Sequence, residues 1–507
     1  MMRIQDMTLE QKAGQLFAVG FPQEYPSDEF MNLVREYRVG NVILFTHNIS
    51  SRQQVSELTK TLFREIGKAT GVIPLISIDE EGGVVSRLPE DTAIMPSARA
   101  QAGTGEEQTV RRAARIVGEE LKAMGINFNL APVLDINSNK DNPLIGVRSF
   151  GKTAEQVRRF GGMAVKGYLD AGILCSGKHF PGHGDTKEDS HLALPVVEAD
   201  RELLMSRELE PFAHLIRQGL PAVTVGHMVV PALEPERLPC TMSGKVVTGL
   251  LREQMRFDGL IISDCLEMAA IKDFYGISRG TVEALKAGID LIFISHTASA
   301  AEEAVLAVRK AIAEGELSME RIDDAVAHIL AAKKRFGTCV WEEGNAGTKE
   351  QMEFAAAFLT RTIRPEQDTG QRFNPGRNPL FIGAAPGRVA LVCDGRQQKD
   401  FAHFMQEHFG GEAIVCSEEP TEEEIREYMA RAADKSSLIT GTLNAHLKPG
   451  QRRMLEMLGS LDIPKAHVAL RDPADLDLLS GCLFRLSLYE YTVRAMEAAK
   501  EYFVPDN

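Results

Sequence analysis

Short apolar runs recur along the first part of the chain, and their alternation with helical patterns most constrains the fold. Each run is almost continuously hydrophobic, as a strand must be when it is buried on both faces. Eight runs occur, over residues 16–19, 42–45, 75–78, 128–133, 174–176, 222–225, 260–262 and 291–294. The helical patterns between them include 110–124, 154–170, 202–218 and 281–287. Eight strand–helix repeats predict a closed (β/α)8 TIM-type barrel, with a doubly wound open sheet as the competing fold.

A second and shorter series of apolar runs follows a segment rich in Gly, Pro and Asn. These runs cover residues 389–392, 413–415, 437–440, 468–470 and 483–486. Five strands are too few for a barrel, so we expect a smaller open α/β sandwich. The predicted division is a catalytic barrel over 1–340, a helix and linker over 341–386, and the sandwich domain over 387–507. The second domain lacks a glycine-rich phosphate-binding motif, which argues against nucleotide binding.

The composition excludes several classes of function. The 507 residues are 44% hydrophobic and 25% charged, with a formal net charge of -14. An acidic chain is a poor candidate for binding nucleic acid, which relies on basic patches. The N-terminus lacks the apolar stretch of a signal peptide, and no run is apolar and long enough to span a membrane. Because the seven cysteines are scattered and form no CxxC pair, we expect free thiols in a cytoplasmic protein.

Polar groups come directly after several apolar runs, where the active sites of barrel enzymes lie. They are Asp79, Lys178, His179, His227 and Asp264. Asp264 has no Lys or Arg nearby in sequence, so its carboxylate can attack an electrophilic carbon, or else cap the next helix. Arg87 and Arg148 add further donors near Asp79, Lys178 and His179, and such a set suits a ligand with several hydroxyl groups. For each residue alone a surface ion pair is the better explanation, and their shared position after the strands favours a functional interpretation.

The segment 178–191 concentrates histidines and carboxylates on one loop. Pro181, Gly182 and Gly184 exclude a continuous helix, so the loop extends from the end of a buried strand. In an extended segment Asp189 and His191 lie on the same side. The carboxylate can then fix the imidazole tautomer and raise its pKa, so that the ring donates and accepts a proton. A purely structural hydrogen bond is the alternative.

The same loop offers a set of possible metal ligands. Mixed imidazole and carboxylate ligands suit zinc or iron, and the candidates are His179, His183, Asp185, Asp189 and His191. Pro181 and Gly182 interrupt the helical spacing that a His-x-x-x-His site requires. We therefore expect neither a metal nor another cofactor.

Together these residues resemble glycoside hydrolase family 3, and within it the two-domain β-N-acetylglucosaminidases. The motifs occur in the family's order and span the first domain. They are Ile78-Asp79-Glu80-Glu81-Gly82-Gly83, Ile145-Gly146-Val147-Arg148-Ser149-Phe150, Lys178-His179-Phe180-Pro181-Gly182-His183-Gly184-Asp185, Asp189-Ser190-His191 and Ser263-Asp264-Cys265-Leu266-Glu267-Met268. Two positions depart from the family pattern, because Glu80 stands where Gln is frequent and Cys265 where Asp, Ala or Ser is frequent. Both adjoin functional positions, where they can tune substrate choice.

The resemblance implies a role for each site residue. Asp264 would be the catalytic nucleophile, and His191 the general acid/base oriented by Asp189. Other branches of the family place a Glu acid/base on the second domain. The pocket for a terminal N-acetylglucosamine would contain Asp79, Arg87, Arg148, Lys178 and His179, with His227 nearby.

The implied activity is that of a retaining, exo-acting β-N-acetylglucosaminidase with a covalent glycosyl-enzyme intermediate. A neutral imidazole does not repel an anion as a carboxylate would, so a phosphorylase of the same family is the alternative. A metal-dependent hydrolase and a non-catalytic sugar-binding protein are further alternatives. The expected partner is an N-acetylglucosamine-containing oligosaccharide or muropeptide, which would link the enzyme to peptidoglycan recycling. The sequence does not predict an oligomeric state.

Overall fold

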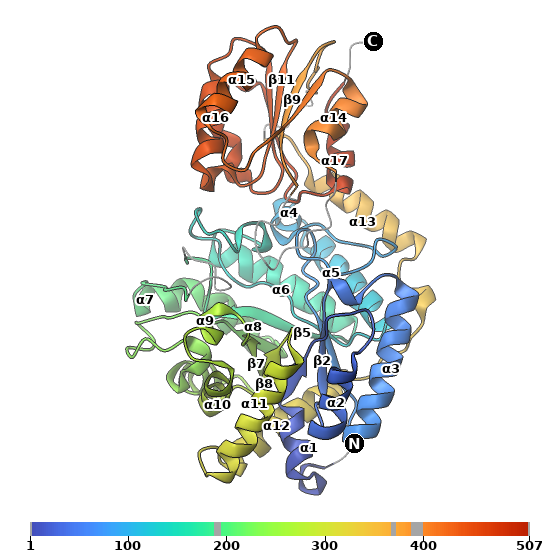
Figure 1. Ribbon diagram of the computed structural model, residues 1–507, viewed down its shortest axis with the longest axis vertical. Coiled ribbons are helices and arrows are strands. Elements are labelled where there is room, and N and C mark those ends of the chain that lie inside the picture. Colours follow the sequence, from blue (N-terminus) through green and yellow to red (C-terminus); the bar gives the residue numbers. More distant parts are fainter. Residues whose placement is uncertain (1–2, 187–193, 367–371, 387–398, 505–507) are drawn as a thin grey trace.

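The first part of the chain forms a closed barrel of parallel strands (Figure 1). The computed structural model describes residues 3–186, 194–366, 372–386 and 399–504. The barrel strands are β1 (Phe17–Val19), β2 (Asn41–Leu44), β3 (Leu75–Ile78), β4 (Phe128–Asn129), β5 (Leu174–Phe180), β6 (Ala222–Val225), β7 (Leu260–Cys265) and β8 (Leu291–Ile294). Each strand pairs with the next along the chain, and β1 pairs with β8 to close the ring. The predicted barrel is confirmed, and the competing prediction of a doubly wound open sheet is wrong.

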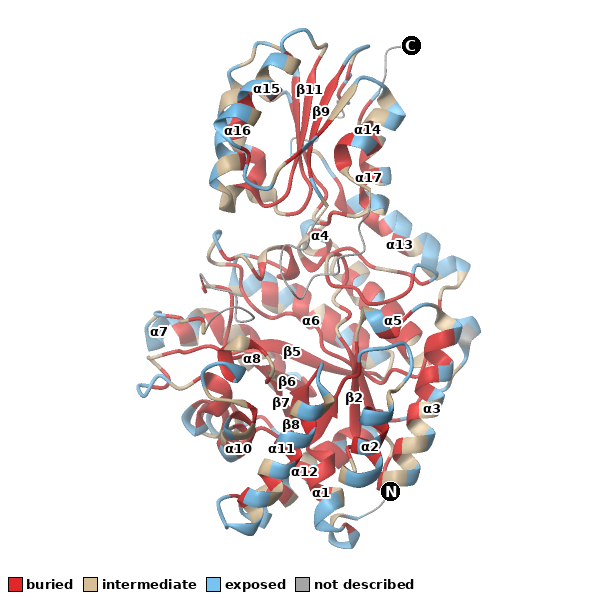
Figure 2. Cartoon of the chain, in the orientation of Figure 1, coloured by how far each residue is buried: buried red, intermediate tan, exposed pale blue. Residues whose placement is uncertain are grey.

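Helices surround the barrel, and the strands between them are buried (Figure 2). The helices are α1 (Leu9–Gln15), α2 (Asp28–Tyr37), α3 (Arg52–Thr70), α4 (Ala98–Gly103), α5 (Glu107–Ala123), α6 (Ala154–Asp170), α7 (Arg201–Leu203), α8 (Glu210–Arg217), α9 (Ala269–Lys272), α10 (Ile277–Ala287), α11 (Ala298–Ala313), α12 (Met319–Phe336) and α13 (Lys349–Thr362). Burial from both sides explains why the strand sequences are continuously apolar rather than alternating.

One predicted helix is interrupted. The sequence predicts a single helix over 202–218, whereas the structure has α7, a π-helical turn at Leu204–Glu208 and then α8. Pro211 lies in the first turn of α8. Proline has no backbone N–H to donate to the preceding turn, so it favours a new helix start at this position.

The second domain is an open parallel sheet with helices on both faces (Figure 1). Its strands are β9 (Leu380–Ala384), β10 (Glu412–Cys416), β11 (Leu438–Thr442), β12 (Lys465–Ala469) and β13 (Phe484–Ser487), in the order β10-β9-β11-β12-β13. Helices α14 (Phe401–Phe409) and α17 (Val493–Lys500) cover one face, and α15 (Glu422–Ala432) and α16 (Pro449–Gly459) cover the other. The predicted α/β sandwich is confirmed.

Strand β9 lies inside the segment 341–386 that the sequence predicts as helix and linker, and this corrects that prediction. The run Leu380–Ala384 is apolar, but Pro379 and Pro386 bound it and Gly383 interrupts it, so it resembled linker sequence. A Cβ at Gly383 would lie 2.9 Å from the backbone nitrogen of Ala402, so glycine lets α14 pack closely on the strand. The run expected over 389–392 lies outside the described residues. We propose that the second domain begins before Leu380.

Helix α17 connects the second domain to the barrel. The guanidinium of Arg494 donates to the carbonyls of Ile94 and Met95, the latter at 3.0 Å, and pairs with the buried carboxylate of Glu490 at 2.8 Å. The carbonyl of Met95 also accepts from the backbone N–H of Gly83 at 2.8 Å. The second domain therefore contacts the segment that follows barrel strand β3.

The structure also bears on the expectations about membrane spans and cysteines. None of the described helices combines the length and the apolar character that crossing a membrane requires. The six cysteines within the described ranges are all free thiols. Cys393 lies outside the described residues.

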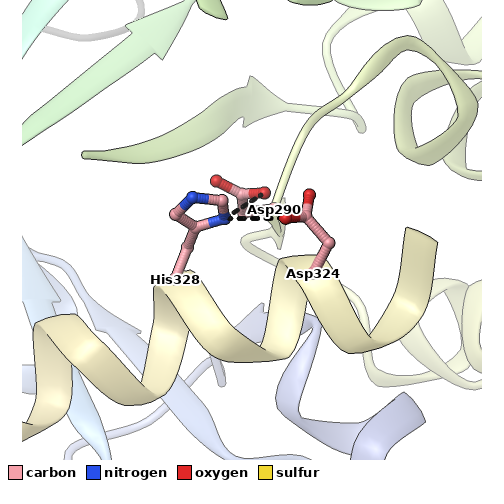
Figure 3. Close-up of side chains that lie close together, drawn as sticks. All are labelled: Asp290, Asp324 and His328. Carbon is pink, nitrogen blue, oxygen red and sulfur yellow. Dashed lines mark ion pairs between the residues drawn. The ribbon is translucent and has the colours of Figure 1, made fainter. Parts of the chain in front are cut away.

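A buried carboxylate joins the last strands of the barrel to α12 at the amino-terminal end of β8. Asp290 accepts from Arg252 and Arg321, each at 2.8 Å, and from the backbone N–H of Ile261 at 3.0 Å. His328 Nδ1 lies 3.4 Å from the same carboxylate (Figure 3). Burial alone would raise the pKa of Asp290, but the neighbouring His328 and the charge of Arg252 lower it below its ordinary value.

We expect Asp290→Asn to lower the free energy of unfolding by about 3 kcal/mol, because two partly buried arginines would lose their anionic partner. Urea unfolding followed by tryptophan fluorescence measures this, since the one tryptophan, Trp341, donates to Thr59 in α3 and reports on the barrel. The matched control is Asp324→Asn, whose half-exposed carboxylate pairs with the same Arg321 and should contribute less than about 1 kcal/mol. Equal losses in the two variants would contradict the role of Asp290.

Candidate active site

A buried cluster of charges lies where strands β3 and β5 end. The ammonium of Lys178 lies 2.6 Å from Asp79 Oδ1 and 2.6 Å from Glu81 Oε1. Arg148 Nε and Nη2 donate to the two oxygens of Glu81, each at 2.8 Å. Three residues predicted for the ligand pocket, Asp79, Arg148 and Lys178, therefore come together. Glu81, which joins them, appeared in the sequence only as part of a motif.

The charges of this cluster stabilise one another. Burial would raise the pKa of Glu81, but Arg148 and Lys178 hold it well below its ordinary range. Burial would lower the pKa of Lys178, but Asp79 and Glu81 raise it, so the ammonium stays charged. The side chain of Asp79 is 16% exposed and that of Glu81 only 4%. Asp79 is therefore the carboxylate of this pair that a ligand can reach.

Glu80 turns away from this cluster. Its Oε2 accepts from Ser86 Oγ at 3.0 Å and from the backbone N–H groups of Arg87 and Leu88 at 2.7 and 3.3 Å. Burial raises the pKa of Glu80 to about 7. The carboxyl group thus supports the turn that carries Arg87, itself a predicted ligand residue and only 5% exposed. The departure from the family's usual Gln leaves the ligand-facing Asp79 in place.

Strand β5 continues further than the sequence predicts. Lys178 and His179 were expected in a loop after Gly177, but the strand runs to Phe180. Main-chain hydrogen bonds extend it, from Lys178 N to Pro132 O at 3.1 Å and from Leu134 N to Lys178 O at 2.6 Å. Lys178 and His179 are polar, so no apolar pattern predicts a strand at these positions. In the structure, buried ion pairs take the place of apolar packing here.

Asp135 is a site residue that the sequence reasoning missed. Its Oδ2 lies 2.6 Å from His179 Nδ1, and its Oδ1 accepts from the backbone N–H of His183 at 2.7 Å. The side chain is completely buried. Burial opposes ionisation, but the charge of His179 and its hydrogen bond lower the pKa of Asp135. A signal was present, because Asp135 follows the apolar run 128–133 as closely as other site residues follow theirs.

The segment 183–186 is held against the loop after β4. His183 Nδ1 lies 2.6 Å from Thr186 Oγ1, and Asn142 Nδ2 donates to the carbonyl of His183 at 2.8 Å. A Cβ at Gly184 would lie 1.6 Å from the carbonyl oxygen of Ile136, so only glycine fits there. Burial lowers the pKa of His183 to about 4, which keeps this imidazole neutral at pH 7. The predicted acid/base pair, Asp189 and His191, lies outside the described residues.

Asp264 lies near the end of β7 and is partly exposed. Its Oδ1 accepts from the backbone N–H of Cys265 at 2.8 Å. The charge of Asp264 also acts to raise the pKa of His183, although burial dominates there. The candidate nucleophile is therefore within electrostatic range of the segment that leads to Asp189 and His191.

His227 contacts the backbone at the end of the same strand, β7. Its Nε2 lies 2.9 Å from the carbonyl oxygen of Cys265, and its Nδ1 lies 2.8 Å from Thr241 Oγ1. The residue is fully buried. His227, predicted to lie near the pocket, thus contacts the backbone next to Asp264. Burial raises the pKa of the Cys265 thiol to about 12, so this group stays protonated beside the candidate nucleophile.

Three of the candidate metal ligands in the predicted loop have partners within the described residues. His179 and His183 direct their Nδ1 atoms to Asp135 and Thr186, and Asp185 pairs with Arg207 at 2.6 Å. Within the described ranges, one group has the geometry of a metal site, consisting of Asp290, Asp324 and His328 (Figure 3). Two arginines already contact its buried carboxylate, so a cation there would meet positive charge.

Comparisons with known proteins agree with this geometry. Residues 8–332 match the family model described as the glycosyl hydrolase family 3 N terminal domain. The solved structure of a glycoside hydrolase family 3 β-N-acetylglucosaminidase from Paenibacillus sp. str. FPU-7 is 37% identical, with a TM-score of 0.88 over 97% of this chain and 96% of that one.

Two curated relatives are similar over more than half of this chain. Beta-hexosaminidase A of Pseudoalteromonas piscicida is 33% identical over 61% of this chain, and the match spans 55% of that protein's length. Beta-hexosaminidase LpqI of Mycobacterium tuberculosis (strain ATCC 25618 / H37Rv) is 35% identical over 64% of this chain and 82% of its own length. This chain thus spans about half the length of the first relative and most of the second.

We expect Glu81→Gln to lower the free energy of unfolding at pH 7 by about 3–5 kcal/mol, because Lys178 and Arg148 would remain buried without their shared anion. Because the folded-state pKa of Glu81 is depressed, its contribution is fully present above the unfolded pKa of about 4.3 and is lost as the pH falls below it. Urea unfolding of both proteins between pH 7 and pH 3 measures this.

The stability of the variant should therefore fall less steeply than that of the unaltered protein as the pH is lowered. The matched control is Glu90→Gln, an exposed carboxylate ten residues after Glu80. If Glu81→Gln and Glu90→Gln gave the same stability and the same pH dependence, the charge cluster would not be a stabilising element.

Proposed function

The chain belongs to glycoside hydrolase family 3, and from this premise we propose that it is a retaining, exo-acting β-N-acetylglucosaminidase. One observation carries the proposal. At the ends of parallel barrel strands, Lys178 on β5 holds the carboxylate of Asp79 after β3 at 2.6 Å, and the carboxylate of Asp264 lies near the end of β7. The names of the relatives, β-hexosaminidase and β-N-acetylglucosaminidase, support hydrolysis of a hexosaminide.

The proposed reaction is a double displacement at the anomeric carbon. Asp264 attacks this carbon while His191 donates a proton to the departing oxygen, and the bond between sugar and leaving group breaks. Water then attacks the glycosyl-enzyme, with His191 accepting a proton as the bond to Asp264 breaks. Two inversions give net retention of configuration. In this proposal Asp189 orients His191 and raises its pKa toward neutrality.

The charge cluster would bind the sugar. Asp79 is its most accessible carboxylate, and Lys178 holds it in place at 2.6 Å. A carboxylate fixed in this way can accept hydrogen bonds from two neighbouring hydroxyl groups without having to reorganise. Arg87, Arg148 and His179 would complete the pocket, with Arg148 acting through Glu81 and His179 held by Asp135.

The substrate that fits these groups is an N-acetylglucosamine-containing oligosaccharide or muropeptide. A neutral imidazole acid/base tolerates an acidic leaving sugar, because it adds no repulsive charge. This agrees with the proposed role in peptidoglycan recycling in the cytoplasm. The same lack of repulsion admits phosphate in place of water as the acceptor.

We expect Asp264→Asn to lower kcat by about 10⁴-fold or more on an aryl N-acetylglucosaminide, because an amide is a poor nucleophile. The control is Asp273→Asn, an exposed carboxylate shortly after the same strand, which should leave kcat unchanged. Retention of most activity in Asp264→Asn would refute the nucleophile assignment. Assays with and without inorganic phosphate identify the acceptor, since a large phosphate-dependent gain in rate would favour a phosphorylase.

We expect His191→Ala to slow substrates with poor leaving groups far more than substrates with activated ones, because only the former need a proton in the transition state. A series of aryl N-acetylglucosaminides with different phenol pKa values measures the dependence. His403→Ala on α14, where the ring pairs with Asp400 at 2.8 Å, is the control and should change no rate. A uniform loss across the series would rule out proton donation by His191.

A further inference from the structure

The second domain contains a buried arginine that lacks a partner within the described residues. Arg471 is only 2% exposed, yet no described residue forms a hydrogen bond or ion pair with its guanidinium, and Nη1 is completely buried. Lys178 and Arg148, which are also deeply buried, are each paired with a carboxylate. A buried charge without a partner is costly, so an anion from outside the described chain would stabilise Arg471.

The position of Arg471 is one at which open parallel sheets bind ligands. It follows strand β12, just beyond Ala469, at the carboxyl edge of the sheet. In open α/β folds ligands bind outside this edge, near the point where the strand order reverses. The order β10-β9-β11-β12-β13 reverses beside β11, the neighbour of β12.

A second donor lies on the adjoining loop after β11. His446 Nδ1 lies 2.7 Å from Asp475 Oδ1, and the same oxygen accepts the backbone N–H of His446 at 2.9 Å. The other oxygen of Asp475 accepts from Ala445 N and Thr442 Oγ1, each at 2.9 Å. Both oxygens of this buried carboxylate therefore have donors, and Oδ1 fixes the ring of His446. Among the described residues none bonds to Nε2 of His446, which stays available to a ligand.

His446 is also disposed to carry a charge. Burial alone would lower its pKa, but hydrogen bonding and charge from Asp475 raise it, with smaller contributions from Asp472 and Asp141. The loop that carries Arg471 also carries Asp475, whose carboxylate contacts His446 at 2.7 Å, so the two loops lie side by side. Of the acidic groups here, Asp475 is occupied, and Asp472 Oδ1 accepts from the backbone N–H of Ala474 at 2.9 Å.

These loops of the second domain adjoin the barrel. Asp141, which acts on His446, belongs to the barrel loop after β4. A Cβ at Gly146 in that loop would lie 3.0 Å from Asp472 Oδ2. The same loop contributes Asn142, which holds His183 and Thr186. The unpaired arginine is thus on a loop that meets the barrel beside the candidate active site.

We propose that Arg471 and His446 form a binding site for a carboxylate or phosphate group, located between the second domain and the barrel loop 138–146. The planar guanidinium offers two parallel N–H donors to such a group, and Nε2 of His446 adds a third. The group belongs either to a free small anion or to an acidic part of the substrate. Binding itself does not depend on the proposed glycosidase activity.

Thermal unfolding of the full chain in increasing inorganic phosphate or acetate tests the site, with chloride at equal ionic strength as the reference. A ligand that binds only the folded state raises the midpoint in a saturable manner. We expect this rise in the unaltered protein for at least one of the two anions. Arg471→Met and His446→Gln should weaken the apparent affinity at least fivefold. The control is Arg426→Met, an exposed arginine on α15 of the same domain, which should respond as the unaltered protein does.

Unfolding without added anion provides a second measurement on the same variants. Arg471→Met should melt no lower than the unaltered protein, because it removes a buried charge that has no partner. Arg471→Lys keeps the charge but loses the paired donors, so it should bind more weakly than arginine. An unchanged affinity in either Arg471→Met or His446→Gln, or the absence of a saturable response to both anions, would overturn the proposal. If phosphate binds at another site instead, it would still raise the unfolding midpoint of these variants.

A kinetic comparison identifies the source of the anion. The ratio of kcat/KM for 4-carboxyphenyl and 4-carbamoylphenyl N-acetylglucosaminide is measured in the unaltered protein and in Arg471→Met. A ratio that falls at least fivefold in the variant assigns the site to an acidic part of the substrate, and an equal ratio assigns it to a free anion. Because the unfolding measurement needs no turnover, failure of the site and failure of the proposed activity are distinguishable.

Discussion

The pairing of buried charges is the constraint on which the site depends. Glu81 accepts from both Lys178 and Arg148 in a region where its side chain is 4% exposed, so three separate segments of the barrel must meet for any of these charges to be tolerated. The three charges depend on one another, because removing one of them would leave the others buried without a partner of opposite charge. It also positions Asp79 through Lys178, so the same contacts that hold the strand ends together prepare a carboxylate for a ligand.

The two domains are linked through the segment that carries these charges. Arg494 of α17 donates to the carbonyl of Met95, which also accepts from the backbone N–H of Gly83. Gly83 belongs to the turn that follows Asp79 and Glu81, and its φ of 57° is one that glycine adopts without strain. The second domain therefore contacts the segment that follows β3 through a main-chain carbonyl that also bonds to the turn after Glu81.

Most of the architecture could be predicted from the sequence, because strands buried on both faces leave continuous apolar runs. The prediction failed where that signal was broken: β9 lies between prolines, β5 continues through charged residues, and Pro211 divides a regular helical pattern. Within the site, motif positions identified Asp79, Arg148 and Lys178. Asp135 was missed because its importance comes from what it contacts, His179 and the backbone of His183. Contacts between separate segments produce no periodic pattern in a single sequence.

The close contact at Gly184 has a consequence for redesign. A β-carbon there would collide with the carbonyl oxygen of Ile136, so close main-chain contact, together with hydrogen bonds to the side chains of Asn142 and Asp135, fixes the start of the segment against the loop after β4. Redesign of this loop for other leaving groups would therefore have to keep Gly184 as its attachment point and retain the proposed acid/base pair, Asp189 and His191.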